Sequence, residues 1–380
     1  MNLKRHRRLG LLIAGAIVGS LALAACSSES SDSGRSGGGE VTQELKDVVA
    51  SYQEEPSSII QTEPLSKVPE KKSVAFIVCA DPTCSILGDF LKEAVESFGW
   101  EYVGINAPAT DFGSAVQQAV DLKVDYIAGT GSDVATFQNA FDNAKEAGIP
   151  YFSCYSGDDP KGDENNIITN CSDVTAVANS TRALTAWVIE DSGADASIGV
   201  VNIPEFPTVA AAVPNVEKTL DEYCDTCTSQ PIDISLDQLT TGGSANAIVS
   251  YLQSNPDINY LFLGFTGFEP GLGQALKTAG LEDVKVVGVQ PQQPQVESFL
   301  KGESAAWLVV PQENTMWTLA DQMARYANGE WSSEDERKSA LTPLYIMDTE
   351  EEAEAIADLP DGWPGPDGFK EQFKTLWGLS

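Results

Sequence analysis

The segment Val74-Ala75-Phe76-Ile77-Val78-Cys79 contains no polar side chain. A strand with one solvated face would alternate apolar and polar residues, so this run predicts a strand that is buried on both faces. Apolar residues at helical spacing follow between Phe90 and Phe98, and Gly99 is placed to end that helix. This strand–helix pair is the unit from which the rest of the chain is built.

The same unit recurs in two series. In the first series further strands are expected at 102–105, 124–128 and 149–154, and in a second series, which begins near Ile167, at 197–201, 230–234, 260–263, 284–289 and 306–310. Helical patterns separate them, among them 137–147, 174–190, 208–223 and 316–327. Two such series predict an α/β protein with two doubly wound parallel sheets, and a length of 380 residues suits two or three domains.

Ligands of such sheets bind outside the carboxyl ends of the strands, and two facing domains enclose a cleft there. The loops at those ends and the expected crossing near residue 312 supply the candidate ligand-binding residues: Asp81, Pro82, Thr130, Asp133, Tyr155, Ser156, Glu205, Phe206, Phe265, Thr266, Gln290 and Gln312. Two alternatives stay open. Asp133 and Asp81 lie near helix starts and would also serve as N-caps, and each aromatic side chain would also fit beneath its own loop.

The first 25 residues have the pattern of a secretion signal. Four basic residues precede an apolar run from Leu9 to Ala25, which ends in small residues. Cys26 directly at the exit resembles a bacterial lipobox, which implies cleavage before Cys26 and a lipid on its sulfur. The alternatives are a plain signal peptide with an incidental cysteine, or an uncleaved anchor helix.

The segments on either side of the two series are less regular. Residues 26–70 predict a lipid-anchored flexible linker: 27–39 is rich in Ser and Gly, a short helical pattern follows at 41–52, and Pro56, Pro64 and Pro69 favour extended chain. Residues 349–380 form an acidic tail that is then rich in Gly, Pro and Trp. Its pattern assigns it no role.

Charge and histidine content exclude several classes of function. The formal net charge is −33, with 23 Lys and Arg against 56 Asp and Glu, so binding to nucleic acid or to an anionic lipid surface is not expected. The single histidine, His6, lies in the expected signal peptide. Histidine-based triads, general bases and metal sites are therefore not expected in the mature protein, and no cofactor or metal is predicted.

Six cysteines follow Cys26, and an even number in an exported protein suggests disulfides. Their places in the expected fold favour the pairs Cys79–Cys84, Cys154–Cys171 and Cys224–Cys227. A zinc site of four cysteines, or a redox pair at Cys224-Asp225-Thr226-Cys227, is the alternative.

The order of the expected strands and helices, together with three short sequence segments, resembles that of the type I solute-binding proteins, and most closely the lipoproteins of sugar ABC importers. The three segments are Ala147-Gly148-Ile149-Pro150, Leu276-Lys277-Thr278-Ala279-Gly280 and Phe299-Leu300-Lys301-Gly302-Glu303. The resemblance covers about residues 71–348 and implies three crossings between two lobes, near Asn170, 310–312 and 344–348. The lobes would then be 71–169 with 311–343, and 170–310 with 344–348.

Charged residues that clamp sugars in that family are replaced here. The sequence reads Tyr155-Ser156 where an Asp-Arg pair is usual, Phe265-Thr266 where Asn-Asp is usual, and Gln290 where an Asp is frequent. Charged bidentate hydrogen bonds hold hydroxyl-rich ligands in a dry cleft, so their loss favours a less polar or aromatic ligand over a simple monosaccharide.

These features predict an extracytoplasmic, lipid-anchored substrate-binding protein of an ABC importer. It would be a monomer that captures a small organic solute, sugar-like or aromatic, and delivers it to a membrane permease, without being an enzyme. A ligand-sensing receptor lipoprotein is the alternative, because the fold does not separate importers from receptors. A histidine-free hydrolase that uses paired carboxylates is a more remote one.

Overall fold

The computed structural model describes residues 40–80, 82–108, 110–331 and 341–379. The predicted signal peptide, Cys26, the tether up to Gly39 and Asp81 lie outside these residues, as does the side chain of Pro82. No helix of the described segments is long and apolar enough to cross a membrane.

The first lobe is built on a sheet of five parallel strands in the order β2-β1-β3-β4-β5. The strands are β1 Ser73–Val78, β2 Glu101–Asn106, β3 Tyr126–Thr130, β4 Tyr151–Cys154 and β5 Ile167–Asn170. Val74 and Phe76 point to one apolar cluster, and Ala75 and Ile77 to another on the opposite face. The apolar run that predicted β1 is therefore explained by burial on both sides.

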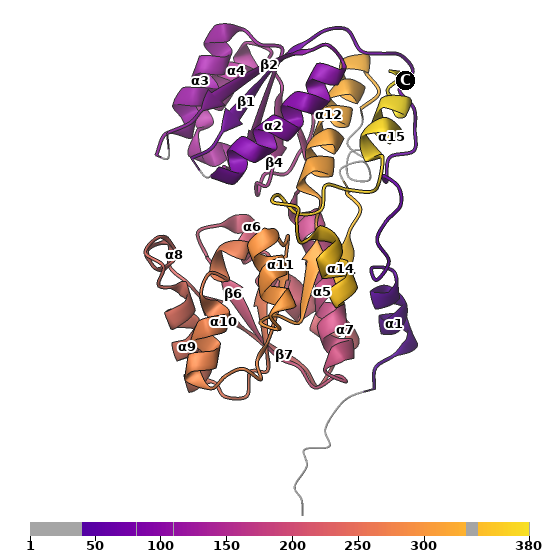
Figure 1. The fold of residues 1–380 in the computed structure, drawn as a ribbon. Coiled ribbons are helices and arrows are strands. Elements are labelled where there is room, and N and C mark those ends of the chain that lie inside the picture. Colours follow the sequence, from indigo (N-terminus) through magenta and orange to yellow (C-terminus); the bar gives the residue numbers. More distant parts are fainter. Residues whose placement is uncertain (1–39, 81, 109, 332–340, 380) are drawn as a thin grey trace, which may run out of the picture. The chain divides into compact units, whose positions relative to one another are not determined.

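Helices cover both faces of this sheet (Figure 1). The cluster of Val74 and Phe76 includes residues of α2 (Pro82–Ser97), α12 (Gln312–Asn328) and α15 (Phe369–Leu376). The cluster of Ala75 and Ile77 includes residues of α3 (Phe112–Leu122) and α4 (Gln138–Glu146). A short 3-10 helix, η1 (Val134–Thr136), precedes α4.

The second lobe is built on a sheet of six strands in the order β11-β10-β9-β8-β6-β7. The strands are β6 Ser197–Asn202, β7 Thr228–Asp233, β8 Tyr260–Leu263, β9 Lys285–Val289, β10 Ala306–Val309 and β11 Tyr345–Met347. Strand β7 contains Pro231, which has no backbone N–H. An edge strand tolerates proline because one of its sides forms no hydrogen bonds with a neighbouring strand. Only parallel strands were expected, whereas β11 is antiparallel to β10.

Two layers of helix also enclose the second sheet. One apolar cluster joins it to α1 (Gln43–Ala50), α5 (Val174–Asp191) and α7 (Ala212–Tyr223). The opposite cluster joins it to α9 (Ser244–Ser254), α10 (Leu272–Ala279), α11 (Gln293–Leu300) and α14 (Glu350–Ile356). The short elements α6 (Pro207–Ala210), α8 (Leu236–Thr240) and η2 (Thr266–Phe268) lie in loops.

The single helix expected at 208–223 is wrong, because the structure divides it into α6 and α7. Pro214 stands in the first turn of α7. It has no N–H, and its ring would clash with the carbonyl of Ala210 in a continuous helix. The break places the α6 turn at the carboxyl end of β6.

The terminal segments are part of the folded body, so the prediction of a flexible linker is wrong for residues 43–70. Leu45 and Val49 of α1 are fully buried in the second lobe, while Ile59 and Leu65 belong to the core of the first. The backbone N–H of Leu65 donates to the carbonyl oxygen of Leu376 at 2.8 Å. The first segment therefore reaches from one lobe to the other.

The C-terminal tail makes the same passage in the opposite direction. Trp363 packs edge-on against Tyr345 in the second lobe, with ring centroids 5.1 Å apart. Trp377 lies in the core of the first lobe and stacks on Trp317 at 5.3 Å with an interplanar angle of 4°. The chain also passes between the sheets after β5, after β10 and before β11, so the two terminal segments add further connections.

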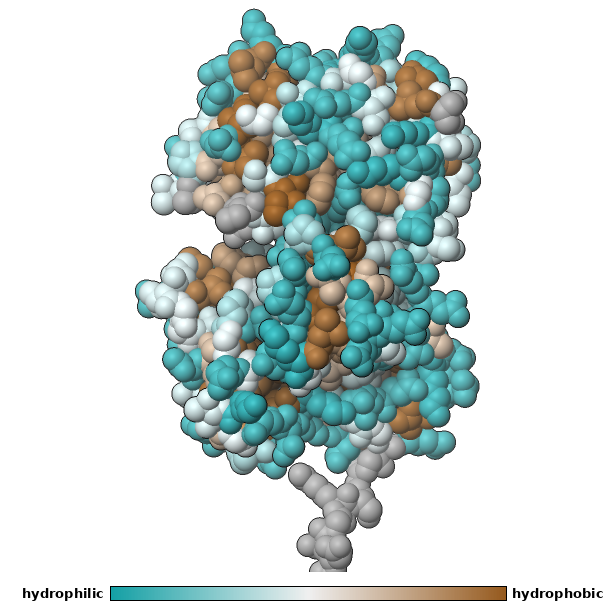
Figure 2. Space-filling view, in the orientation of Figure 1, coloured by the Kyte–Doolittle hydropathy of each residue, from teal (hydrophilic) through white to brown (hydrophobic). Residues whose placement is uncertain are grey.

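The visible surface is mostly hydrophilic, with hydrophobic residues in small separate patches (Figure 2). This agrees with the large excess of acidic over basic residues in the sequence.

Candidate functional site

The carboxyl ends of both sheets meet at a cavity of about 990 Å³. Its walls come from the loops after β3 and β4 in the first lobe and after β6, β8 and β9 in the second. Figure 2 shows a notch between the two lobes at the left of the view. The cavity is large enough for a small organic molecule, and its position is the one that parallel sheets favour for ligands.

The cavity brings together every predicted site residue whose side chain the structure describes. These are Thr130, Asp133, Tyr155 and Ser156 from the first sheet, Glu205, Phe206, Phe265, Thr266 and Gln290 from the second, and Gln312 from the start of α12. Asp81 and the side chain of Pro82 are outside the described part. Contact of each residue with a ligand stays a prediction.

Tyr155 and Gln290 approach each other from opposite lobes. The Gln290 Nε2 donates to the Tyr155 hydroxyl at 3.4 Å. Their φ angles are 52° and 57°, in the left-handed region that side chains with a Cβ disfavour. Burial raises the pKa of Tyr155 to about 12, although hydrogen bonds with Thr315 and Gln290 lower it in part. The phenol is thus neutral near pH 7 and able to donate a hydrogen bond.

Two carboxylates connect the loops after β3 and β4 of the first lobe, and of the two only Asp133 lines the cavity. Asp133 Oδ1 accepts from the backbone N–H of Gly157 at 2.7 Å. The Asp158 carboxylate accepts from the N–H of Val134 at 3.0 Å and from the Ser156 hydroxyl at 3.1 Å. Burial, with a contribution from Asp133, raises the pKa of Asp158. Asp133 occupies the N-cap position of η1, as the alternative expected, but its side chain makes no capping hydrogen bond to that helix.

The aromatic groups divide between cavity and core. Phe206 and Phe265 are partly buried and line the cavity. Phe268 is fully buried and meets Phe265 edge-on at 5.7 Å between centroids, so it supports the ring that faces the cavity. Packing beneath the loop, considered for each aromatic, describes Phe268, and it also applies in part to Phe206 and Phe265, which pack against the same core cluster while they line the cavity.

The six cysteines form the three predicted disulfides, with Cα–Cα distances of 5.5 Å for Cys79–Cys84, 4.7 Å for Cys154–Cys171 and 5.4 Å for Cys224–Cys227. The four-cysteine zinc site is therefore wrong. The first two disulfides border the cavity, where Cys79, Cys84 and Cys171 line its wall. The third follows the end of α7 and lacks the helix N-terminus that lowers thiol pKa values in redox pairs.

Sequence reasoning missed at least three parts of the wall, one of which is the segment from Leu341 to Leu344 before β11. Asn179, Ser180 and Thr181 line it from α5, and a polar stretch within a helix that follows a crossing was a usable signal. The stretch from Ser51 to Ile60 also contributes, but nothing in its pattern indicated where it would pack.

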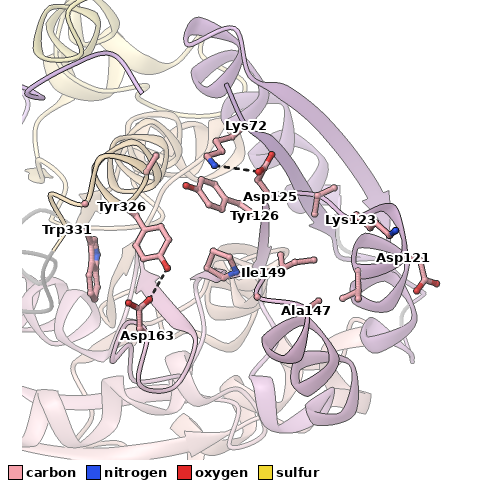
Figure 3. A pocket seen from close by; sticks show the side chains of 16 residues that line it. Lys72, Asp121, Lys123, Asp125, Tyr126, Ala147, Ile149, Asp163, Tyr326 and Trp331 are labelled. Carbon is pink, nitrogen blue, oxygen red and sulfur yellow. Dashed lines mark hydrogen bonds and ion pairs between the residues drawn. The ribbon is translucent and has the colours of Figure 1, made fainter. Parts of the chain in front are cut away.

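A second hollow of about 1140 Å³ lies at the opposite, amino ends of β1, β3 and β4 (Figure 3). Four of its polar groups form two pairs: the Tyr326 hydroxyl donates to Asp163 Oδ1 at 2.8 Å, and Lys72 Nζ lies 3.5 Å from Asp125 Oδ1. The Trp331 Nε1 has no hydrogen-bond partner among the described residues, so a polar group of this hollow is also left open. The inter-lobe cavity is the better candidate for a ligand site because it lies at the carboxyl ends of both sheets and takes side chains from both lobes.

Residues 74–330 match the family model described as a periplasmic binding protein domain. This is more than half of the chain, so the protein belongs to that family, which consists of non-enzymatic solute-binding proteins. A search of curated protein sequences finds no match.

Solved structures with the same fold include solute-binding proteins of sugar ABC transporters. A carbohydrate transporter protein of Acidothermus cellulolyticus in complex with myo-inositol is 16% identical, covering 77% of this chain and 99% of that one, with a TM-score of 0.61. A 5-methylthioribose-binding protein of Thermotoga lettingae is 12% identical, with coverage of 84% and 100% and a TM-score of 0.62. A protein of Actinobacillus succinogenes with bound D-allose is 18% identical, with coverage of 75% and 100% and a TM-score of 0.60. At these identities the similarity establishes the fold.

Proposed function

We propose that the chain is the extracytoplasmic substrate-binding lipoprotein of an ABC importer. It captures a small organic solute, sugar-like or aromatic and less polar, and delivers it to the membrane permease. The observation that carries this proposal is the inter-lobe cavity at the carboxyl ends of both sheets, lined by side chains of both lobes.

Binding would couple to closure of the lobes about their connections. A ligand that touches Tyr155 of one lobe and Phe265 of the other gains contacts only when both lobes surround it. It then shifts the equilibrium toward the closed form by its differential affinity for that form. In this proposal the lobes are 71–169 with 311–343 and 170–310 with 344–348, while the terminal segments reinforce the connections.

The N-terminal pattern supports the location. Export by residues 1–25 and a lipid on Cys26 would hold a monomer at the outer face of the cell membrane, next to its permease. The ligands named for structures of the same fold, D-allose, myo-inositol and 5-methylthioribose, support a screen that begins with sugars and polyols. The aromatic groups of the cavity extend it to nucleosides and aromatic compounds.

A thermal-shift screen of the purified protein tests the proposal. A ligand at 100 times its dissociation constant stabilises the folded state by about 2.7 kcal/mol, which is a clear rise in Tm. Absence of any shift across sugars, polyols, nucleosides and aromatic compounds would count against solute capture. Import is then tested by uptake of the labelled ligand in cells with and without the protein, and uptake that does not depend on the protein would favour a receptor.

A further inference from the structure

We propose that the cavity selects by charge: it takes an uncharged or cationic ring-bearing solute and rejects the anionic analogue of the same solute. This inference rests on the proposed function and specifies the class of ligand for that same site.

The charged side chains of the cavity wall are all of one sign. Among the described lining residues the only charged ones are Asp133 and Glu205, one from each lobe. The remaining polar groups are hydroxyls and amides, such as Thr130, Gln290 and Gln312. An anionic solute would therefore meet no lysine or arginine along the described wall.

One basic residue, Arg182, directly follows a lining residue in the sequence, but its side chain bonds to groups outside the cavity. Thr181 lines the cavity, but the guanidinium of the next residue, Arg182, bonds to the hydroxyl of Tyr223 and lies 3.4 Å from the Glu222 carboxylate. Both partners are on α7, and this fixes the charge outside the cavity.

The negative charge of Asp133 on the cavity wall is not neutralised. In the described part of the chain Asp133 forms no ion pair, and its carboxylate accepts a hydrogen bond from the backbone N–H of Gly157. Glu205 on the other lobe is exposed. Carboxylates on both sides of a closing cleft raise the free energy of a bound anion and lower that of a cation.

Gln312 supplies an independent observation that points to a hydrogen-bond donor on the ligand. Its side chain lines the cavity and is 9% exposed, yet its Oε1 has no partner among the described residues. A buried acceptor without a partner is costly, and a ligand hydroxyl or N–H would satisfy it, whereas a carboxylate or phosphate oxygen would not.

Aromatic rings provide the faces for the body of the ligand. Tyr155 lines the first-lobe side, and Phe206 and Phe265 line the second-lobe side. Rings contributed by both lobes suit a flat or cyclic solute, which would stack on one or more of them.

The test is isothermal titration calorimetry of the purified protein with matched pairs of compounds in about 150 mM salt, where long-range attraction is screened. The pairs are glucose with glucuronate, adenosine with adenosine monophosphate, and tyramine with 4-hydroxyphenylacetate. We expect binding within at least one pair, with the anionic member about 100-fold weaker than its neutral or cationic counterpart.

Two charge-reversal variants separate the effect of a charge in the cavity wall from the effect of the net charge of the protein. Glu205→Lys should improve the affinity for the anionic member of that pair about tenfold, because it places a cation beside the cavity. Glu217→Lys makes the same change at an exposed site of α7 outside the cavity wall and should leave the ratio within the pair unchanged.

The outcomes separate the two proposals. If the anionic member binds as tightly as its counterpart, charge selection is wrong and solute capture stands. If Glu217→Lys changes the ratio as much as Glu205→Lys does, net charge and not the cavity wall determines selectivity, and this also overturns the inference. No binding in any pair counts against solute capture itself.

Discussion

Gln290 Nε2 donates a hydrogen bond to the hydroxyl of Tyr155 at 3.4 Å, so a loop of the second lobe is joined directly to a loop of the first. Both residues have positive φ angles, and neither is glycine. Each such backbone conformation costs on the order of 1–2 kcal/mol and persists where surrounding structure holds it, often at ligand sites. The pair is therefore a natural place for a ligand to act on both lobes at once.

Removal of the Tyr155 hydroxyl tests this role. Tyr155→Phe keeps the ring and loses the hydrogen bond to Gln290, so we expect the affinity for the ligand found in the screen to fall about tenfold. The free energy of unfolding should fall by no more than about 1.5 kcal/mol, the net contribution of an ordinary hydrogen bond. Titration calorimetry and urea unfolding measure the two quantities.

A matched control is available for that variant. The Tyr251 hydroxyl donates to Gln230 Oε1 at 3.2 Å in the second lobe and does not line the cavity. Tyr251→Phe should leave affinity unchanged. If Tyr155→Phe and Phe265→Ala both bind the ligand as the parent protein does, these side chains do not belong to the site.

The C-terminal tail should contribute strongly to stability. Trp377 is fully buried, stacks on Trp317, and donates through Nε1 to Asp321 Oδ1 at 2.8 Å. Trp377→Ala leaves a large cavity and should lower the free energy of unfolding by about 3–5 kcal/mol. Trp377→Phe retains most of the packing but leaves a buried carboxylate short of one donor, which costs about 1–3 kcal/mol. Equal, small effects of both substitutions in urea unfolding would show that the tail is not part of the cooperative core.

The end of α3 offers a stabilising substitution. Lys123 caps this helix with φ 57° and ψ 43°, and its backbone N–H donates to the carbonyl oxygen of Val120. Lys123→Gly removes the steric cost of the left-handed conformation and should raise the free energy of unfolding by about 1 kcal/mol. Lys92→Gly, at an exposed position inside α2, should instead lower it by about 1 kcal/mol. A loss of stability in both variants would contradict the left-handed cap.

Sequence patterns predicted those strands and helices whose burial shows in the spacing of apolar residues along the chain. Continuous apolar runs such as that from Val74 to Cys79 identify strands that are covered on both faces, and the convergence of their carboxyl ends placed Tyr155 and Gln290 at one cavity. Strand β11 was missed because its three residues acquire strand conformation only by pairing with β10. The burial of Trp377 and the positive φ of Tyr155 arise from contacts between segments far apart in the chain, so no local pattern carries them.

Asp125 should make stability depend on acid pH. Partial burial acts to raise the pKa of this carboxyl, but hydrogen bonds from the backbone and side chain of Ser73 and the charge of Lys72 together outweigh it and hold the pKa below its usual value of 3.8. A lowered pKa in the folded state means that the ionised group stabilises the fold above the unfolded pKa. This contribution is lost as the pH falls from about 4 through the folded pKa.

Asp125→Asn should therefore flatten the curve of stability against pH below about 4, whereas Asp121→Asn, at an exposed position nearby, should not. Urea unfolding at several pH values measures both curves, and identical acid sensitivity of the Asp125→Asn variant and the parent protein would contradict the assignment.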